Sequence, residues 1–193
     1  MKTIIALIGK AGAGKDTILK ELCLHNPFYN NIISCTTRPP RENEINGIDY
    51  YFISDQLFAE KILNGDMLEA TMFNNWGYGT MLSSLKDGIN IGVFNPDGFR
   101  YLTELHSDNI KVIGFYIHCN DKIRLLRQLN RESDPDVKEI VRRYTADEFD
   151  FSELEYDVDY NIRNETEEQL YECATIIQDI ADRTLIATKS GQN

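Results

Sequence analysis

A short apolar run, followed at once by a glycine-rich loop and a helical pattern, is the feature that most constrains the fold of this chain. Residues Ile4 to Ile8 are typical of a buried strand, and Lys15 to Leu24 carry apolar residues at helical spacing. Between them the sequence matches GxxxxGK, a loop whose backbone N–H groups surround phosphate oxygens while its lysine neutralises the β and γ phosphates. The loop residues are Gly9, Lys10, Ala11, Gly12, Ala13, Gly14 and Lys15. An ordinary glycine-rich turn is the alternative, but the flanking strand and helix favour ATP binding.

The two residues after Lys15 depart from this motif. A serine or threonine normally follows the lysine and contacts Mg²⁺, whereas this chain has Asp16 and then Thr17. We expect both residues to belong to the ATP-binding loop. Thr17 is the first candidate for the Mg²⁺ ligand, and Asp16 is the second.

Strands and helices alternate along the rest of the chain. Strands are expected at 32–33, 89–94, 110–117 and 158–162, with a long helix after the last of them. Such alternation is typical of α/β proteins with a parallel, doubly wound sheet. The predicted fold class is therefore α/β of the P-loop NTPase type, in a single domain spanning residues 1–193.

Residues 34–88 are expected to form a small αβ lobe inserted beside this core. The segment is rich in turns, polar residues and aromatic residues. Within it Asn46-Gly47 predicts a hairpin, Ser54 predicts the N-cap of a helix through Leu63, and Met67 to Phe73 predicts a strand. The sequence thus places a second, smaller structural unit directly after the first two core elements.

Residues 126–146 are expected to form a helical lid. Two helical patterns flank a polar break at 130–135. The core of the domain then comprises residues 1–33, 89–125 and 147–193.

The charge of the chain excludes some partners. It has 31 acidic and 20 basic residues and a net charge of −11. Sequence-independent affinity for nucleic acids or anionic membranes comes from clustered Lys and Arg, so neither is an expected partner. Small anionic ligands are compatible with this charge because arginines gather locally, at 38–41 and 124–143.

The cysteines and histidines do not form a metal-binding pattern. They are widely scattered, lack CxxC spacing and do not group as zinc ligands would. They are Cys23, Cys35, Cys119, Cys173, His25, His106 and His118. The first apolar run is also shorter than a signal-peptide core, and no later stretch approaches a membrane span. We therefore expect a soluble cytoplasmic protein with reduced cysteines.

A longer pattern follows the phosphate loop. Ser34-Cys35-Thr36-Thr37-Arg38-Pro39-Pro40-Arg41 precedes Glu44-Ile45-Asn46-Gly47-Ile48-Asp49-Tyr50-Tyr51-Phe52, then Glu69, then Gly77-Tyr78-Gly79-Thr80. This order and spacing closely resemble the guanylate kinase family over residues 1 to about 100, and the helix–lid–helix layout beyond fits as well. The resemblance implies a P-loop nucleoside-monophosphate kinase that moves the γ-phosphoryl group of ATP, with Mg²⁺, onto GMP or dGMP.

The resemblance assigns the phosphate of the acceptor nucleotide to four side chains. They are Arg38, Arg41, Tyr50 and Tyr78. Two forked guanidinium groups suit a phosphate because they donate in a planar, bidentate geometry, and the tyrosines add phenolic hydroxyls.

The resemblance also assigns the guanine base. Glu69 is its expected reader, because a carboxylate accepts the N1 and N2 protons of guanine and adenine offers no N1 proton. Ser34 and Thr80 would add hydroxyls near O6. Asp97 would contact the acceptor nucleotide, whereas Asn95 stands where the family usually carries another acid.

Arginines of the lid are expected to act on the phosphoryl group in flight. Phosphoryl transfer depends on positioning and on neutralising spread charge, and lid closure excludes water. By resemblance Arg131 and Arg143 take this role, with Arg142 as a rival for the second position. Together with Lys15 and Arg38 they form the expected catalytic set.

Two alternatives stay open at this level. One is a guanylate kinase-like protein-interaction module without catalysis, against which the retained lysine and glycines of the loop weigh. The other is a broader deoxynucleoside-monophosphate kinase, against which Glu69, Ser34 and Thr80 weigh. The sequence does not indicate an oligomeric state.

Overall fold

The fold is built around a parallel sheet. The structure is a computed structural model that describes residues 1–73, 75–105, 107, 109–131, 133–152, 154 and 157–190; His106, and Glu132 in the expected lid, lie outside this set. The described residues form a five-stranded sheet in the order β2-β7-β1-β8-β9, parallel throughout. The strands are β1 (Lys2–Ile8), β2 (Asn30–Asn31), β7 (Gly88–Val93), β8 (Ile110–His118) and β9 (Tyr160–Arg163).

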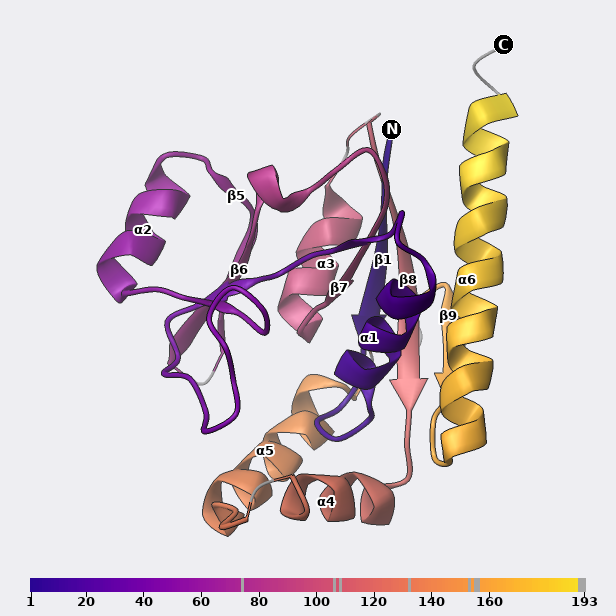
Figure 1. The fold of residues 1–193 in the computed structure, drawn as a ribbon. Helices are drawn as coiled ribbons and strands as arrows, with labels where there is room; N and C mark the ends of the chain where they lie inside the picture. Colours follow the sequence, from indigo (N-terminus) through magenta and orange to yellow (C-terminus); the bar gives the residue numbers. More distant parts are fainter. Residues whose placement is uncertain are drawn as a thin grey trace.

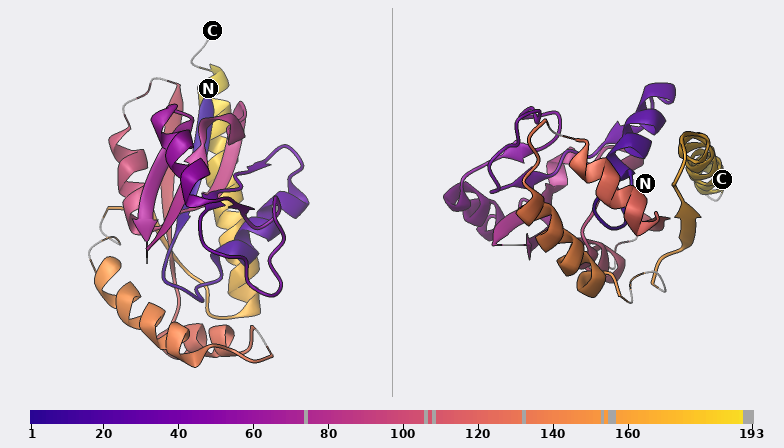
Figure 2. Two further views of the ribbon diagram at one scale, coloured as in Figure 1. Left: turned by 90° about the vertical axis from the view of Figure 1, so that its left-hand side faces the viewer. Right: turned by 90° about the horizontal axis from the view of Figure 1, so that it is seen from below.

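Helices cover both faces of this sheet (Figures 1 and 2). On one face α1 (Lys15–His25) and α6 (Glu167–Ser190) pack on Ile5 and Leu7 of β1, and on the other α3 (Pro96–Glu104) packs on Ile4 and Ile8. Successive side chains of a strand point to opposite faces, so one apolar run supplies both cores. The predicted α/β, doubly wound fold is confirmed.

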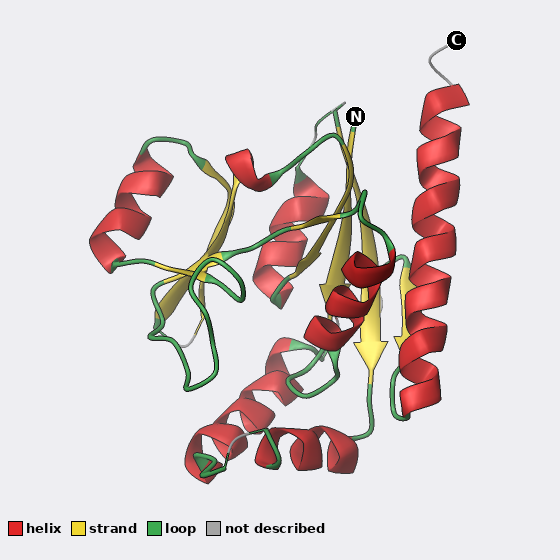
Figure 3. Ribbon diagram, in the orientation of Figure 1, coloured by secondary structure: helices red, strands yellow, loops and turns green. Residues whose placement is uncertain are grey.

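A second sheet lies beside the first, as Figure 3 shows. In the described residues it has the order β4-β3-β6-β5, built from β3 (Cys35–Thr36), β4 (Tyr51–Phe52), β5 (Met67–Phe73) and β6 (Trp76–Met81). A helix, α2 (Asp55–Leu63), begins at Ser54, whose side chain accepts a hydrogen bond from Leu57 N, and a 3-10 turn, η1 (Leu82–Ser84), leads back to the core. The predicted helix and the predicted strand at 67–73 are both confirmed.

Two sequence expectations about short elements were wrong. Residues Ile32 and Ile33 are not a strand, because β2 pairs with β7 two residues earlier, at Asn30 and Asn31, and the chain then joins the other sheet at Cys35. Asn46-Gly47 forms a turn, with Gly47 N donating to Tyr50 O at 2.8 Å, but not a hairpin. The strand after this turn, β4, pairs in parallel with β3 instead of folding back on its own neighbour.

Two helices close the lower side of the molecule in Figure 1. They are α4 (Asp121–Leu129) and α5 (Val137–Asp150), and Asp136 caps α5 by accepting from Glu139 N. The polar break expected at 130–135 lies between them. Among the described residues, no helix is both long enough and apolar enough to cross a membrane.

Candidate active site

The glycine-rich loop joins the carboxyl end of β1 to the start of α1. Gly12 and Gly14 adopt φ values of +80° and +91°, in the left-handed region that favours glycine. A Cβ on Gly12 would stand 2.5 Å from the backbone oxygen of Arg124, and one on Gly14 would stand 2.4 Å from Nδ2 of Asn164. The loop therefore keeps its backbone exposed to a ligand only with glycine at these two positions.

Lys15 curls back over this loop. Its Nζ donates to the backbone oxygens of Gly9 at 2.6 Å and Lys10 at 3.2 Å. Burial lowers the pKa of Lys15, while the nearby carboxylates of Asp16 and Asp147 oppose this effect. Two carbonyl oxygens hold this buried ammonium group, and no ion pair of Lys15 is found among the described residues. The positive charge is therefore available to an anionic ligand.

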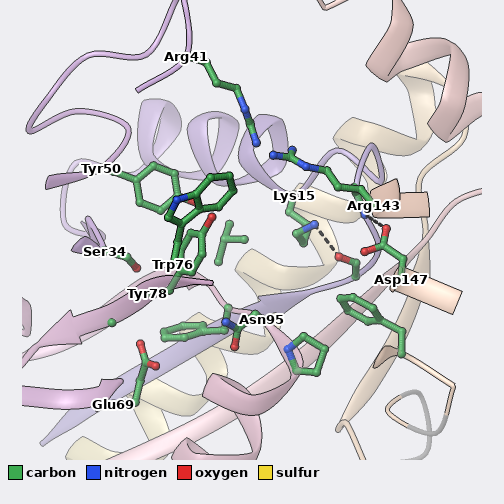
Figure 4. Close-up of a pocket in the computed structure, with 17 residues that line it drawn as sticks. Lys15, Ser34, Arg41, Tyr50, Glu69, Trp76, Tyr78, Asn95, Arg143 and Asp147 are labelled. Carbon is green, nitrogen blue, oxygen red and sulfur yellow. Dashed lines mark hydrogen bonds between the residues drawn. The ribbon is translucent and has the colours of Figure 1, made fainter. Parts of the chain in front are cut away.

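A cavity of about 190 Å³ opens between the loop, the second sheet and α5 (Figure 4). The expected site residues that line it are Gly9, Ala11, Lys15, Ser34, Arg41, Tyr50, Glu69, Tyr78 and Arg143. In Figure 4, Arg41 and Arg143 extend toward each other at one end, and Glu69 lies at the other end. The cavity thus has a cationic end beside Lys15 and a carboxylate end away from it.

The carboxylate end is buried. Glu69 is 5% exposed and lies opposite Thr80 in the β5–β6 ladder. Burial raises the pKa of Glu69 to about 7, against the lowering effect of hydrogen bonds from the side chain and backbone of Thr80. Ser34 Oγ lies 3.5 Å from the hydroxyl of Thr80, which is fully buried behind Glu69. These groups offer hydrogen-bond acceptors and hydroxyls to a polar, planar ligand.

The cationic end continues into a second cleft lined by arginines from separate parts of the chain. Arg38, Arg41, Arg131 and Arg143 all line it, together with Glu139. Arg38 is 4% exposed and does not line the first cavity; its guanidinium lies over the ring of Tyr50, with 5.6 Å from Cζ to the centroid. Burial and the neighbouring Arg143 lower the pKa of Arg41. Cations gathered in this way suit a ligand with several phosphate oxygens.

The expected lid arginines differ in their surroundings. Arg143 lines both cavities and donates from Nε to Glu139 Oε1 at 2.7 Å. Arg142, the rival, pairs with the same Glu139 and its side chain is 42% exposed. Arg131 lines the second cleft. The structure therefore brings Arg131 and Arg143 together with Arg38 and Arg41 in one cleft.

Comparison with known proteins agrees with this geometry. A family model described as guanylate kinase matches residues 1–180. The chain belongs to the guanylate kinase family. A guanylate kinase of Campylobacter jejuni (strain RM1221) is 31% identical over 182 residues, covering 90% of this chain and 86% of the relative.

A second relative and a solved structure extend the comparison. A guanylate kinase of Prochlorococcus marinus (strain MIT 9312) is 30% identical over 174 residues, which cover 82% of this chain and 91% of the relative. The crystal structure of guanylate kinase from Anaplasma phagocytophilum has a TM-score of 0.70 and 22% identity, covering 95% of this chain and 86% of that one. That structure supports the same fold for most of this chain.

One residue expected in the acceptor site lies elsewhere in this guanylate kinase fold. Asp97 is in the first turn of α3, where its side chain is 64% exposed and pairs with Arg100 at 3.2 Å. Asn95 lines the cavity instead, accepting from Gly98 N at 2.7 Å and donating to Thr71 Oγ1 at 2.8 Å. Asn95 is the N-cap of α3 and Pro96 also lines the cavity, whereas Asp97 is not part of the lining. The position of Asp97 does not support its expected contact.

The donor set for a metal ion consists of oxygen atoms. Asp16 and Thr17 are both exposed in the first turn of α1, and Asp16 lines a neighbouring cavity with Ser34 and Tyr50. Carboxylate and hydroxyl oxygens are ligands that Mg²⁺ accepts, so the residues present fit this ion. Within the described part of the chain, no group of three or more His, Cys, Asp or Glu side chains is arranged to hold a metal by itself.

Several residues of the site were missed by sequence reasoning. Asp147 accepts from Ala11 N at 2.7 Å and from Arg124 Nη1 at 3.2 Å, so it ties α5 to the phosphate loop. It lies four residues after Arg143, and this helical spacing would have placed both on one face. Trp76 lines both cavities, and no pattern in the sequence marked it. Glu44 lay inside the family motif but was given no role.

Proposed function

We propose that this protein is a guanylate kinase that transfers the γ-phosphoryl group of ATP to GMP or dGMP, giving ADP and GDP or dGDP. The observation that carries the proposal is that one cavity is lined by Lys15 of a phosphate loop, by arginines, and at its other end by the buried Glu69. Membership of the guanylate kinase family supports the same activity.

On the donor side, the loop from Gly9 to Thr17 holds the phosphates of ATP. Its backbone N–H groups and Lys15 neutralise the β and γ phosphates. Mg²⁺ would be contacted by Asp16 or Thr17, and when bound it neutralises charge on the phosphate oxygens. Asp147 keeps the loop in place through its hydrogen bond with Ala11 N.

On the acceptor side, Glu69 accepts the N1 and N2 protons of guanine, with the hydroxyls of Ser34 and Thr80 nearby. Adenine offers no N1 proton, so its binding leaves a buried acceptor unpaired. Arg41, Tyr50 and Tyr78 line the cavity toward Lys15 and receive the phosphate of GMP, with Arg38 behind Tyr50. The phosphate oxygen is already an anion, so the transfer needs no strong general base.

The lid supplies the last charges. Arg131 and Arg143 lie over the phosphoryl group in flight, and Arg143 is favoured over Arg142 because it lines both cavities. We further propose residues 34–88 as the acceptor lobe, residues 126–146 as the lid, and the cytoplasm as the location. Closure of the lid excludes water, which would otherwise compete as the acceptor.

The test is ADP formation from ATP and Mg²⁺ with GMP, dGMP, AMP, CMP, UMP and dTMP offered one at a time. Turnover confined to GMP and dGMP is expected. Turnover spread across the bases would replace the proposal with a broader deoxynucleoside-monophosphate kinase. No turnover with any acceptor would favour a binding module without catalysis.

A further inference from the structure

Glu44 is a buried carboxylate that the proposed function leaves without a task. Its side chain is 5% exposed, although it lies in a loop between β3 and β4. Buried carboxylates are costly unless they are paired and hydrogen-bonded. Its contacts therefore indicate what holds it there.

Glu44 is hydrogen-bonded by Arg38 and Arg41, two arginines of the proposed acceptor site. Nη2 of Arg38 donates to both oxygens of Glu44, at 3.0 and 2.8 Å. Arg41 donates to the same carboxylate from its backbone N at 2.9 Å and from Nη1 at 3.4 Å. Burial alone would raise the pKa of Glu44, but these donors outweigh it and lower the pKa, so the group stays ionised at neutral pH.

The same carboxylate also reaches the lid. Nη2 of Arg131, just after α4, lies 4.0 Å from Glu44 Oε1. Without Glu44, Arg38, Arg41 and Arg131 would face one another as like charges in a partly buried cleft. One side chain thus lies where the acceptor lobe and the lid meet.

The orientation of Arg38 shows what the carboxylate fixes. Nη1 donates to Pro39 O at 2.7 Å, Nη2 is taken by Glu44, and Nε is buried without a hydrogen-bond partner among the described residues. Its guanidinium carbon also lies 5.6 Å from the ring centroid of Tyr50 and 5.7 Å from that of Phe52. Glu44 therefore sets the position of Arg38, and through it the wall of the cavity at Tyr50.

We propose that Glu44 is a positioning residue of the acceptor-phosphate site, which holds Arg38 and Arg41 in place and brings Arg131 toward them. This inference rests on the proposed function, because it assumes that these arginines receive the phosphate of GMP. Its effect should be confined to ligands that carry this phosphate. Guanosine, which lacks it, should bind independently of Glu44.

The experiment compares GMP with guanosine in three variants of the full chain. Glu44→Gln removes the charge, Glu44→Asp keeps the charge and withdraws it by one methylene, and Glu42→Gln is the matched control at an exposed acid two residues away. Trp76 is the only tryptophan of the sequence and lines the cavity, so its fluorescence reports binding directly. Thermal unfolding of each variant is measured in parallel.

We expect Glu44→Gln to raise the Kd for GMP by about tenfold or more and to leave the Kd for guanosine within about twofold. Glu44→Asp should recover part of the loss, and Glu42→Gln should bind both ligands like the wild type.

If Glu44→Gln binds GMP as tightly as the wild type or more tightly, Glu44 does not position the arginines. Equal weakening of GMP and guanosine in both Glu44 variants would also refute the inference, because it would indicate a general loss of the lobe. A wild-type protein that binds no GMP would refute the proposed function, and this inference with it.

Discussion

Replacing Glu69 with Gln should make the unliganded protein more stable at alkaline pH while weakening its choice of base. Glu69 is 5% exposed, and burial raises its pKa to about 7. No cation of the described residues offsets this burial, and the hydrogen bonds from Thr80 offset it only in part. Ionised Glu69 therefore destabilises the folded state because its charge is desolvated, and an amide of the same size removes that charge.

The size of this effect follows from the pKa difference. The folded value of about 7 exceeds the ordinary value of 4.5, and 7 − 4.5 gives 2.5 units, or about 3 kcal/mol at 1.36 kcal/mol per unit. Because the folded pKa is raised, the cost is absent below the unfolded pKa, grows as pH rises, and is complete above the folded pKa. Between about pH 5.5 and pH 8 the wild type should thus lose about 2 kcal/mol that the Gln variant does not lose.

Urea unfolding of the wild type, Glu69→Gln and the exposed control Glu42→Gln at both pH values measures this difference. The stability gap between Glu69→Gln and the wild type should widen from acid to alkaline pH, whereas Glu42→Gln should follow the wild type. A gap that stays constant within about 0.5 kcal/mol would refute a desolvated Glu69.

The same carboxylate should make GMP binding weaken by about tenfold from pH 8 to pH 6, as its ionised fraction falls, and Glu69→Gln should lack this part of the pH dependence.

Three further outcomes are expected. Lys15→Ala should lower ADP formation by about a hundredfold or more with an unchanged circular dichroism spectrum, since the lysine neutralises transferred charge; turnover near the wild-type rate would contradict its role. Asp16→Ser should bind ATP about tenfold more tightly in EDTA, because a carboxylate at the loop repels metal-free triphosphate; unchanged affinity would place Asp16 away from the phosphates. Arg143→Ala should lower kcat by about a hundredfold while Arg142→Ala changes it by less than about threefold; the reverse order would identify Arg142 as the lid arginine.

The parts of the fold predicted correctly are those with a strong local signal. Apolar runs long enough to cross a sheet identified β1, β5, β7 and β8, and Ser54 identified the start of α2, which ends at Leu63 as expected. Two-residue strands such as β2 and β3 have no such signal, because their pairing partners lie far away in the sequence. That is why a strand was expected at Ile32 and Ile33, between the two that exist.

The lining of the candidate site was predictable where the chemistry and the motif point to the same residue. Phosphate binding requires glycines and a lysine, and base recognition requires a carboxylate. The loop glycines, Lys15 and Glu69 meet these requirements, and each lines the main cavity or forms the loop beside it. Asp147 and Arg124 were missed because their partnership with the loop joins residues more than a hundred positions apart. The contact expected of Asp97 rested on the family resemblance, and it stays a prediction because the side chain is 64% exposed and pairs with Arg100.

Glu44 and Glu69 show why burial alone does not define the role of a side chain. Both side chains are about 5% exposed, yet the pKa of Glu44 is lowered and that of Glu69 is raised to about 7. The difference is the partner, since Glu44 lies against Arg38 and Arg41, whereas in the described part of the chain Glu69 is held by hydrogen bonds from Thr80. A carboxylate already saturated by donors can organise the arginines around it but has little capacity left for a ligand. A carboxylate buried without a cation gains most from a ligand that brings two N–H donors, and guanine is such a ligand.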